Sequence, residues 1–86
     1  MITAEAAKAE VLVVESMYDE EVYREFVIRA VAELRVRGWT VTVHVQKPSG
    51  EWLPPVAEST RSYETPRLAL SEGLARGREI VDSMFR

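Results

Sequence analysis

Apolar residues occupy every second position in two neighbouring stretches of the chain. In the first stretch most of the intervening residues are charged, which is the period of a strand with one buried face. Its apolar residues are Phe26, Ile28, Ala30, Ala32, Leu34 and Val36. The second stretch alternates Trp39, Val41, Val43 and Val45 with polar residues. Because β-branched and aromatic residues suit a pleated sheet, the two stretches predict a β-hairpin.

The turn of this hairpin is predicted at Arg37 and Gly38, where Gly38 supplies the positive φ that a two-residue turn needs. If the pairing of the two strands were shifted by one residue, apolar side chains of one strand would lie opposite polar side chains of the other. The pattern therefore specifies which side chains share a face. With this turn the apolar cross-strand pairs are Val36–Trp39, Leu34–Val41, Ala32–Val43 and Ala30–Val45.

An alternative interpretation makes residues 19–37 a helix, because apolar residues also recur there at a spacing of four. These residues are Val22, Phe26, Ala30 and Leu34. On a helical wheel, however, Glu33 and Arg37 fall on or beside the apolar stripe and Ile28 lies almost opposite it. The strand pattern has no such exception and is preferred.

The first 20 residues are expected to be an N-terminal helix or a partly ordered segment. Thr3 is a candidate N-cap for a helix over residues 3–18, which begins with the helix-forming run of residues 4–10. Residues 19–21 would then form a connection. The alternative is a buried strand at residues 11–14, which accompanies the helical interpretation of residues 19–37.

Two further elements follow the predicted hairpin. The turn residues 47–50 lead into a third strand near Glu51, in which Trp52 and Val56 are expected on the same face as Val45. Its prolines at positions 54 and 55 donate no ladder hydrogen bond, so it belongs at a sheet edge. Thr65-Pro66 is a typical helix start, which predicts a helix over residues 65–85.

Together these elements predict a single α+β domain over residues 1–86. Its core is a three-stranded antiparallel meander over residues 22–63, with both helices on one face, in the order αβββα. The alternative order is βαββα, a two-layer sandwich. Gly73 and Gly77 lie on the apolar side of the last helix, which indicates a close approach of its backbone to the sheet.

Several short motifs run through the last three quarters of the chain. They are Gly38-Trp39, Gly50, Tyr63-x-Thr65, Ala69-Leu70 with Gly73, and Gly77-Arg78-x-Ile80-x-Asp82. In these motifs the chain resembles a group of small bacterial proteins with which we associate no established activity, and the resemblance implies a fold alone. The αβββα order is also similar to that of double-stranded RNA-binding domains. Their lysine-rich start of the last helix is replaced here by Thr65-Pro66-Arg67-Leu68.

The composition narrows the classes of function. The net charge of −3 argues against a general binder of polyanions, which needs clustered Lys and Arg. The absence of cysteine excludes disulfides and thiolate chemistry. No apolar run approaches the roughly 20 residues of a membrane span, and no secretion signal is recognised, so a cytoplasmic protein is expected. No cofactor, metal site or catalytic residue is predicted.

The polar face of the hairpin is the predicted binding surface. It gathers basic and polar side chains around His44, the only histidine of the chain. The candidate binding residues are Arg29, Val31, Arg35, Arg37, Thr42, His44 and Gln46. We expect a non-enzymatic interaction module that associates with itself or with another protein. The alternative is a nucleic-acid-binding domain that uses this same face.

Overall fold

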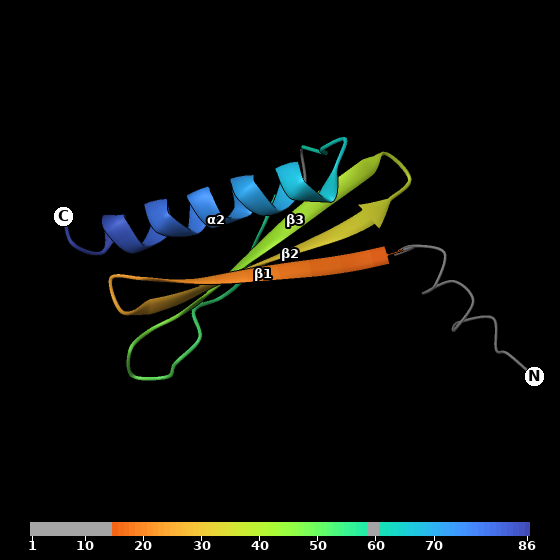
Figure 1. Ribbon diagram of the computed structural model, residues 1–86. Coiled ribbons are helices and arrows are strands. Elements are labelled where there is room, and N and C mark those ends of the chain that lie inside the picture. Colours follow the sequence, from red (N-terminus) through yellow and green to blue (C-terminus); the bar gives the residue numbers. More distant parts are fainter. Residues whose placement is uncertain (1–14, 59–60) are drawn as a thin grey trace, which may run out of the picture.

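The structure, a computed structural model, describes residues 15–58 and 61–86. Its elements are β1 (Glu15–Tyr23), β2 (Phe26–Arg35), β3 (Gly38–Gln46), β4 (Val56–Ala57) and α2 (Pro66–Ser83). The strands form one antiparallel sheet in the order β1-β2-β3-β4. The helix α2 lies across one face of this sheet (Figure 1), which we name the inner face. The chain therefore has an α+β fold.

The strands β2 and β3 confirm the predicted hairpin and its two faces. Because residues 26–35 form a strand, the helical interpretation of residues 19–37 and the βαββα order are wrong. The even-numbered residues of β2 from Phe26 to Ala32 are buried, and so are the odd-numbered residues of β3 from Trp39 to Val45. The alternation of apolar and polar residues therefore identified the buried side of both strands.

The predicted turn and cross-strand pairs are wrong. The turn lies one residue earlier than predicted, and the pairing of β2 with β3 is shifted by two residues. The turn residues are Val36 and Arg37, and Leu34 faces Trp39 instead of Val41. A shift of two residues preserves the faces, because side chains alternate with a period of two. Gly38 has φ +126° and follows the turn, in the last of its four positions, where glycine is favoured. Val36, expected to face Trp39, is 92% exposed.

The strand β1 replaces the helix that was expected to reach residue 18, and residues 19–21 lie within it. That prediction is therefore wrong for residues 15–18, while residues 1–14 lie outside the described part of the chain. All nine residues of β1 pair with β2. The two strands are joined by Arg24 and Glu25, which both have positive φ, as a tight hairpin turn requires. This pairing outweighs the weak local preference for helix.

The third predicted strand is interrupted, and its two ends present opposite faces. Trp52 forms an isolated bridge with Gln46, whereas Val56 pairs with Val43. From Trp52 to Val56 the chain advances four residues, whereas the paired segment of β3 from Val43 to Gln46 advances three. The one extra residue reverses the side-chain alternation. Val56 lies on the inner face as predicted. The inner-face position predicted for Trp52 is wrong, because Trp52 shares the outer face with Gln46.

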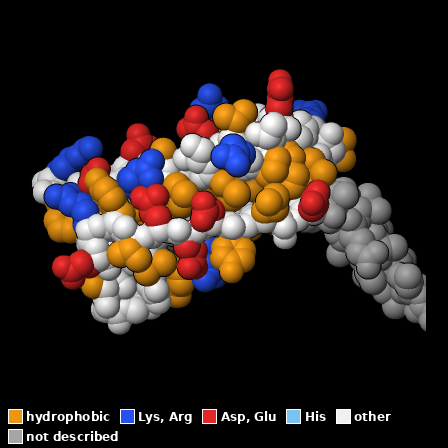
Figure 2. All heavy atoms as spheres, viewed as in Figure 1, with side chains coloured by type: hydrophobic (Ala, Val, Ile, Leu, Met, Phe, Trp, Pro, Cys, Tyr) orange, Lys and Arg blue, Asp and Glu red, His pale blue; other side chains and the backbone are white. Residues whose placement is uncertain are grey.

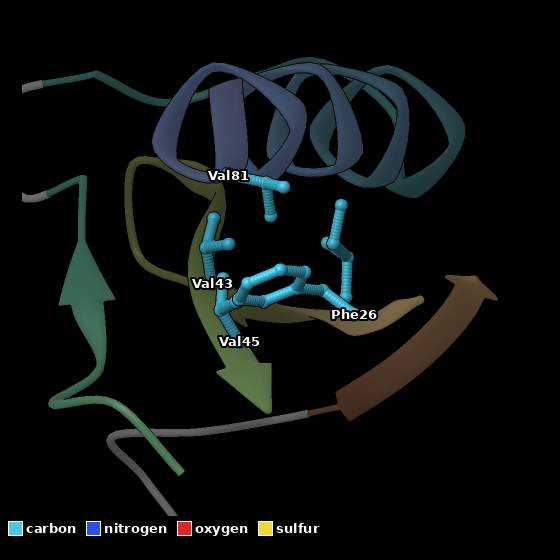
Figure 3. Packing of buried hydrophobic residues seen from close by; sticks show 5 residues of the cluster. Phe26, Val43, Val45 and Val81 are labelled. Carbon is cyan, nitrogen blue, oxygen red and sulfur yellow. The ribbon is translucent and has the colours of Figure 1, made fainter. Parts of the chain in front are cut away.

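The core lies between α2 and the central strands. Phe26, Val43 and Val45 point from the sheet towards Val81 on α2 (Figure 3), and these residues form one buried cluster with Ile28. A second cluster lies nearer the start of the helix and consists of Ala30, Ala32, Trp39, Val41 and Ala69. The helix begins as predicted, because the Thr65 hydroxyl accepts a hydrogen bond from the backbone of Leu68 at 3.1 Å.

The contacts of β1 and the turn after it with α2 include a group of polar interactions. Arg78 donates to both carboxylate oxygens of Glu21 at 2.9 Å. The Tyr23 hydroxyl donates to Asp82 at 2.9 Å, and Arg24 forms an ion pair with the same carboxylate at 3.1 Å. Within the described residues, no helix is both long and apolar enough to cross a membrane.

Gly77→Ala tests the close approach of α2 to the sheet, because an added Cβ would overlap Cγ2 of Ile28. We expect the variant to lose about 1–3 kcal/mol of unfolding free energy, as overpacking does. Alanine at an unobstructed helix site would instead add roughly 0.5–1 kcal/mol. Chemical denaturation measures the change. The double variant with Ile28→Ala should lose less than the sum of the single losses, and strict additivity would contradict the overlap.

Tyr23 predicts a dependence of stability on alkaline pH. The hydrogen bond from its hydroxyl to the Asp82 carboxylate raises the pKa of Tyr23 above its ordinary value of 10.0. The folded state then holds the proton more tightly than the unfolded state, so stability falls as the pH rises above about 10. Thermal unfolding between pH 9 and 11.5 measures this slope. We expect Tyr23→Phe to reduce the slope and Tyr18→Phe to retain it; equal slopes in all three proteins would contradict the assignment.

Candidate interaction surface on the outer sheet face

The outer face carries one arginine between two aromatic rings. Arg29 on β2 lies opposite Glu20 on β1 and opposite His44 on β3. Its guanidinium carbon is 5.4 Å from the ring centre of Tyr18 and 5.4 Å from that of Trp52. The His44 ring meets Trp52 edge to face, with centroids 6.5 Å apart. We name Tyr18, Glu20, Arg29, His44 and Trp52 the outer-face cluster.

The cluster orients side chains more than it stabilises the fold. Arg29 Nε donates to the Glu20 carboxylate, and both side chains are about two-fifths exposed. An ion pair with this exposure contributes about 0–1 kcal/mol. Each arginine–aromatic contact at an exposed site adds about 0.5–1 kcal/mol. The rings and the guanidinium thus hold one another in place at the surface.

Valines of β1 and β2 extend the apolar part of this face. Val22 lies opposite Val27, and Val31 lies opposite Tyr18. Val22 is 74% exposed, Tyr18 66% and Trp52 42%. The open side of an antiparallel sheet is usually polar. No described element covers the outer face, so these side chains form an exposed apolar patch.

The charges on the outer face occur in pairs of opposite sign. Arg29 is paired with Glu20, and Arg35 with Glu33 at 2.8 Å. These two pairs cancel, so the strands present no net charge around the cluster. The face predicted to be locally positive is therefore balanced by acidic residues, one of which comes from the unforeseen strand β1.

The structure brings together most of the predicted binding residues. Those on the outer face of β2 and β3 are Arg29, Val31, Thr42, His44 and Gln46, all half-buried. Arg35 lies at the far end of β2, beside the turn, and Arg37 lies in the turn itself. Both are exposed. The centre of the candidate surface is thus nearer His44 than Arg35.

Tyr18 and Glu20 were missed by sequence reasoning, whereas the strand near Trp52 was considered as a possible interaction surface with the Trp52 side chain on the wrong face. The alternation of β1 is weak, and the helix-forming run at residues 4–10 favoured a helix in its place. In the observed strand Ser16, Tyr18, Glu20 and Val22 share one face. Trp52 was assigned to the core because the extra residue before Val56 reverses the alternation. The signal that favours the observed position is the turn at residues 47–50, which sets Trp52 opposite Gln46.

Two grooves run along α2 on the inner face. The groove towards β1 has a volume of about 590 Å³ and is lined by Met17, Leu70 and Leu74 among others. The groove towards β4 has a volume of about 510 Å³ and is lined by charged side chains of α2 together with Glu58 and Arg61. His44 borders neither groove. Among the described residues, no group of three or more His, Asp or Glu side chains is placed to hold a metal ion.

Comparisons with known proteins add no relative to this description. No protein-family model matches the chain, and no match was found among curated proteins or among solved structures. The resemblances to small bacterial proteins and to double-stranded RNA-binding domains therefore stay predictions. The outer-face cluster must be interpreted from its own chemistry.

The two tryptophans offer a direct test of the sheet faces. Trp39 is 7% exposed and belongs to the core, whereas Trp52 lies on the outer face. We expect Trp39→Ala to cost about 3–5 kcal/mol of unfolding free energy, as the loss of a buried aromatic ring does. Trp52→Ala should cost about 1 kcal/mol or less, in the range of surface contacts. Chemical denaturation compares the two variants, and equal losses would contradict the assignment of Trp52 to the outer face.

Proposed function

We propose that this protein is a non-enzymatic interaction module that associates with a second copy of itself through the outer sheet face. The observation that carries the proposal is the apolar patch around Arg29, which the described elements leave open to solvent. Single exposed apolar residues are ordinary on protein surfaces. Here Tyr18, Val22 and Trp52 are all more than two-fifths exposed on one face.

The charge balance of this face favours a second copy as the partner. The chain carries a net charge of −3, so two copies repel each other in general. The outer face, with Arg29 and Arg35 each paired with an acidic residue, is locally neutral. Two copies approaching through this face bring their apolar side chains together without opposing net charges. Aromatic residues and arginine are also the types enriched at protein interfaces.

Nucleic-acid binding is the second candidate, and one observation favours it. Tyr18 and Trp52 flank Arg29 on an open sheet, and exposed aromatic rings of this kind can stack on single-stranded bases. The neutralisation of Arg29 by Glu20 and the acidic net charge weigh against it. A titration with labelled single-stranded oligonucleotides at low ionic strength separates the two proposals, because phosphate-driven binding weakens steeply with salt.

Val22→Glu and Val36→Glu form a matched pair that tests self-association. Both valines are exposed and both changes add one negative charge, but Val22 lies on the outer face and Val36 in the β2–β3 turn. We expect the unaltered protein and Val36→Glu to dimerise in analytical ultracentrifugation. Val22→Glu should dimerise at least about tenfold more weakly, because a carboxylate would have to be desolvated or opposed by its copy.

Two results would contradict the proposal. One is an unaltered protein that stays monomeric at high concentration, and the other is an equal effect of the two glutamates. The oligonucleotide titration is expected to show no salt-dependent binding. If the oligonucleotides bind, if their affinity falls steeply with salt concentration, and if Trp52→Ala abolishes the binding, then nucleic-acid binding replaces self-association as the proposed function.

A further inference from the structure

The sheet has one long open edge and one short protected edge. Its order places β1 and β4 at the outside. β4 has two residues and follows Pro54 and Pro55, which donate no backbone hydrogen bond. β1 has nine residues, all in continuous register with β2, and among the described residues no strand pairs with its other side. An edge of this length presents a row of backbone donors and acceptors to a further strand.

The backbone of β1 offers its outward groups at alternate residues. The pair Tyr23–Phe26 closes a two-residue turn and therefore exchanges its hydrogen bonds within the hairpin. Alternation along the strand then directs the N–H groups of Ser16, Tyr18, Glu20 and Val22 away from β2. One observation agrees with this assignment: the Glu20 N–H donates to the Asp19 side chain at 2.9 Å. Within residues 15–58 and 61–86, the outward donors of Ser16, Tyr18 and Val22 have no acceptor, whereas the Glu20 donor is held by the side chain of its neighbour and would have to exchange that bond for one to a partner strand.

The charge of β1 indicates which kind of strand would pair with it. The strand carries Glu15, Asp19, Glu20 and Glu21 and no lysine or arginine. Acidic side chains lie along the strip occupied by β1 (Figure 2). Arg29 and Arg78 neutralise Glu20 and Glu21. Glu15 and Asp19 make no ion pair with the described residues, so the edge keeps a negative charge.

A second copy of the chain is a poor partner for this edge. Antiparallel pairing of two β1 strands would set acidic residues against acidic residues, which destabilises directly opposed positions. A strand rich in lysine or arginine would meet opposite charges at the same positions. The backbone hydrogen bonds would supply affinity, as they do in other cases of strand addition to a sheet edge.

We infer that the β1 edge binds an extended, basic segment of a partner protein by strand addition. This interaction is distinct from self-association, because it uses the backbone edge of β1 and leaves the packing of the outer face unchanged. The geometry requires a partner segment without proline at the paired positions. A segment of about eight residues would match the length of the edge.

A fluorescent octapeptide of sequence Lys-Val-Lys-Thr-Lys-Val-Lys-Thr is a suitable probe. Its control replaces both valines by proline, which keeps the charge and prevents strand pairing. We expect fluorescence anisotropy to show binding of the first peptide and at least about tenfold weaker binding of the second. In NMR spectra, the amides of Ser16, Tyr18, Glu20 and Val22 should shift and exchange more slowly with solvent when the first peptide binds.

A matched pair of protein variants, in place of altered peptides, also tests strand addition at the β1 edge. Ser16→Pro removes one outward N–H and should weaken peptide binding at least about fivefold, whereas Ser16→Ala retains the N–H and should bind as the unaltered protein does. Equal binding of the two peptides would show attraction by charge alone and overturn the inference. The absence of binding, or amide shifts confined to other strands, would overturn it as well, even if Ser16→Pro does not fold.

Discussion

The close approach of α2 to the centre of the sheet is the constraint on which the rest of the structure depends. A Cβ at Gly73 would lie 2.6 Å from Val41 and 2.9 Å from Ala30, and a Cβ at Gly77 would overlap Ile28. The glycines each cost about 1 kcal/mol of helix propensity. Their small size lets the backbone of α2 approach β2 and β3 closely enough to bury the apolar side of both strands. One helix in this position covers the two central strands and only borders β1.

This placement of α2 explains why β1 differs in character from its neighbours. The inner faces of β2 and β3 are apolar because the helix covers them. The inner face of β1 includes Asp19 and Glu21, and Glu21 reaches the helix through an ion pair with Arg78. A strand attached by such polar contacts keeps most of its side chains exposed. No element of the described part of the chain covers its outer face or its second edge.

The alternation of residues made the faces of β2 and β3 predictable, but local signals were insufficient elsewhere. Gly38 indicated a turn without deciding whether glycine stands inside it or after it, and both registers bury the same side chains except Val36, which only the predicted register places in the strand. The mutual backbone hydrogen bonds of Trp39 with Tyr63 join residues far apart in sequence and could not be foreseen. For the candidate site, Arg29 and His44 followed from the alternation, whereas Tyr18 belongs to a strand that tertiary pairing alone defines.

The two proposed surfaces differ in charge, and this difference keeps their partners separate. On the outer face each acidic residue of the outer-face cluster and its surroundings has an arginine beside it, so apolar contact can decide what binds there. On the edge of β1, Glu15 and Asp19 form no ion pair with the described residues, and charge opposes pairing with an identical strand. Acidic residues on an open edge are a known protection against uncontrolled sheet extension. Because that protection depends on the sign of the charge, we expect it to oppose pairing with the β1 strand of another copy and to permit pairing with a basic strand.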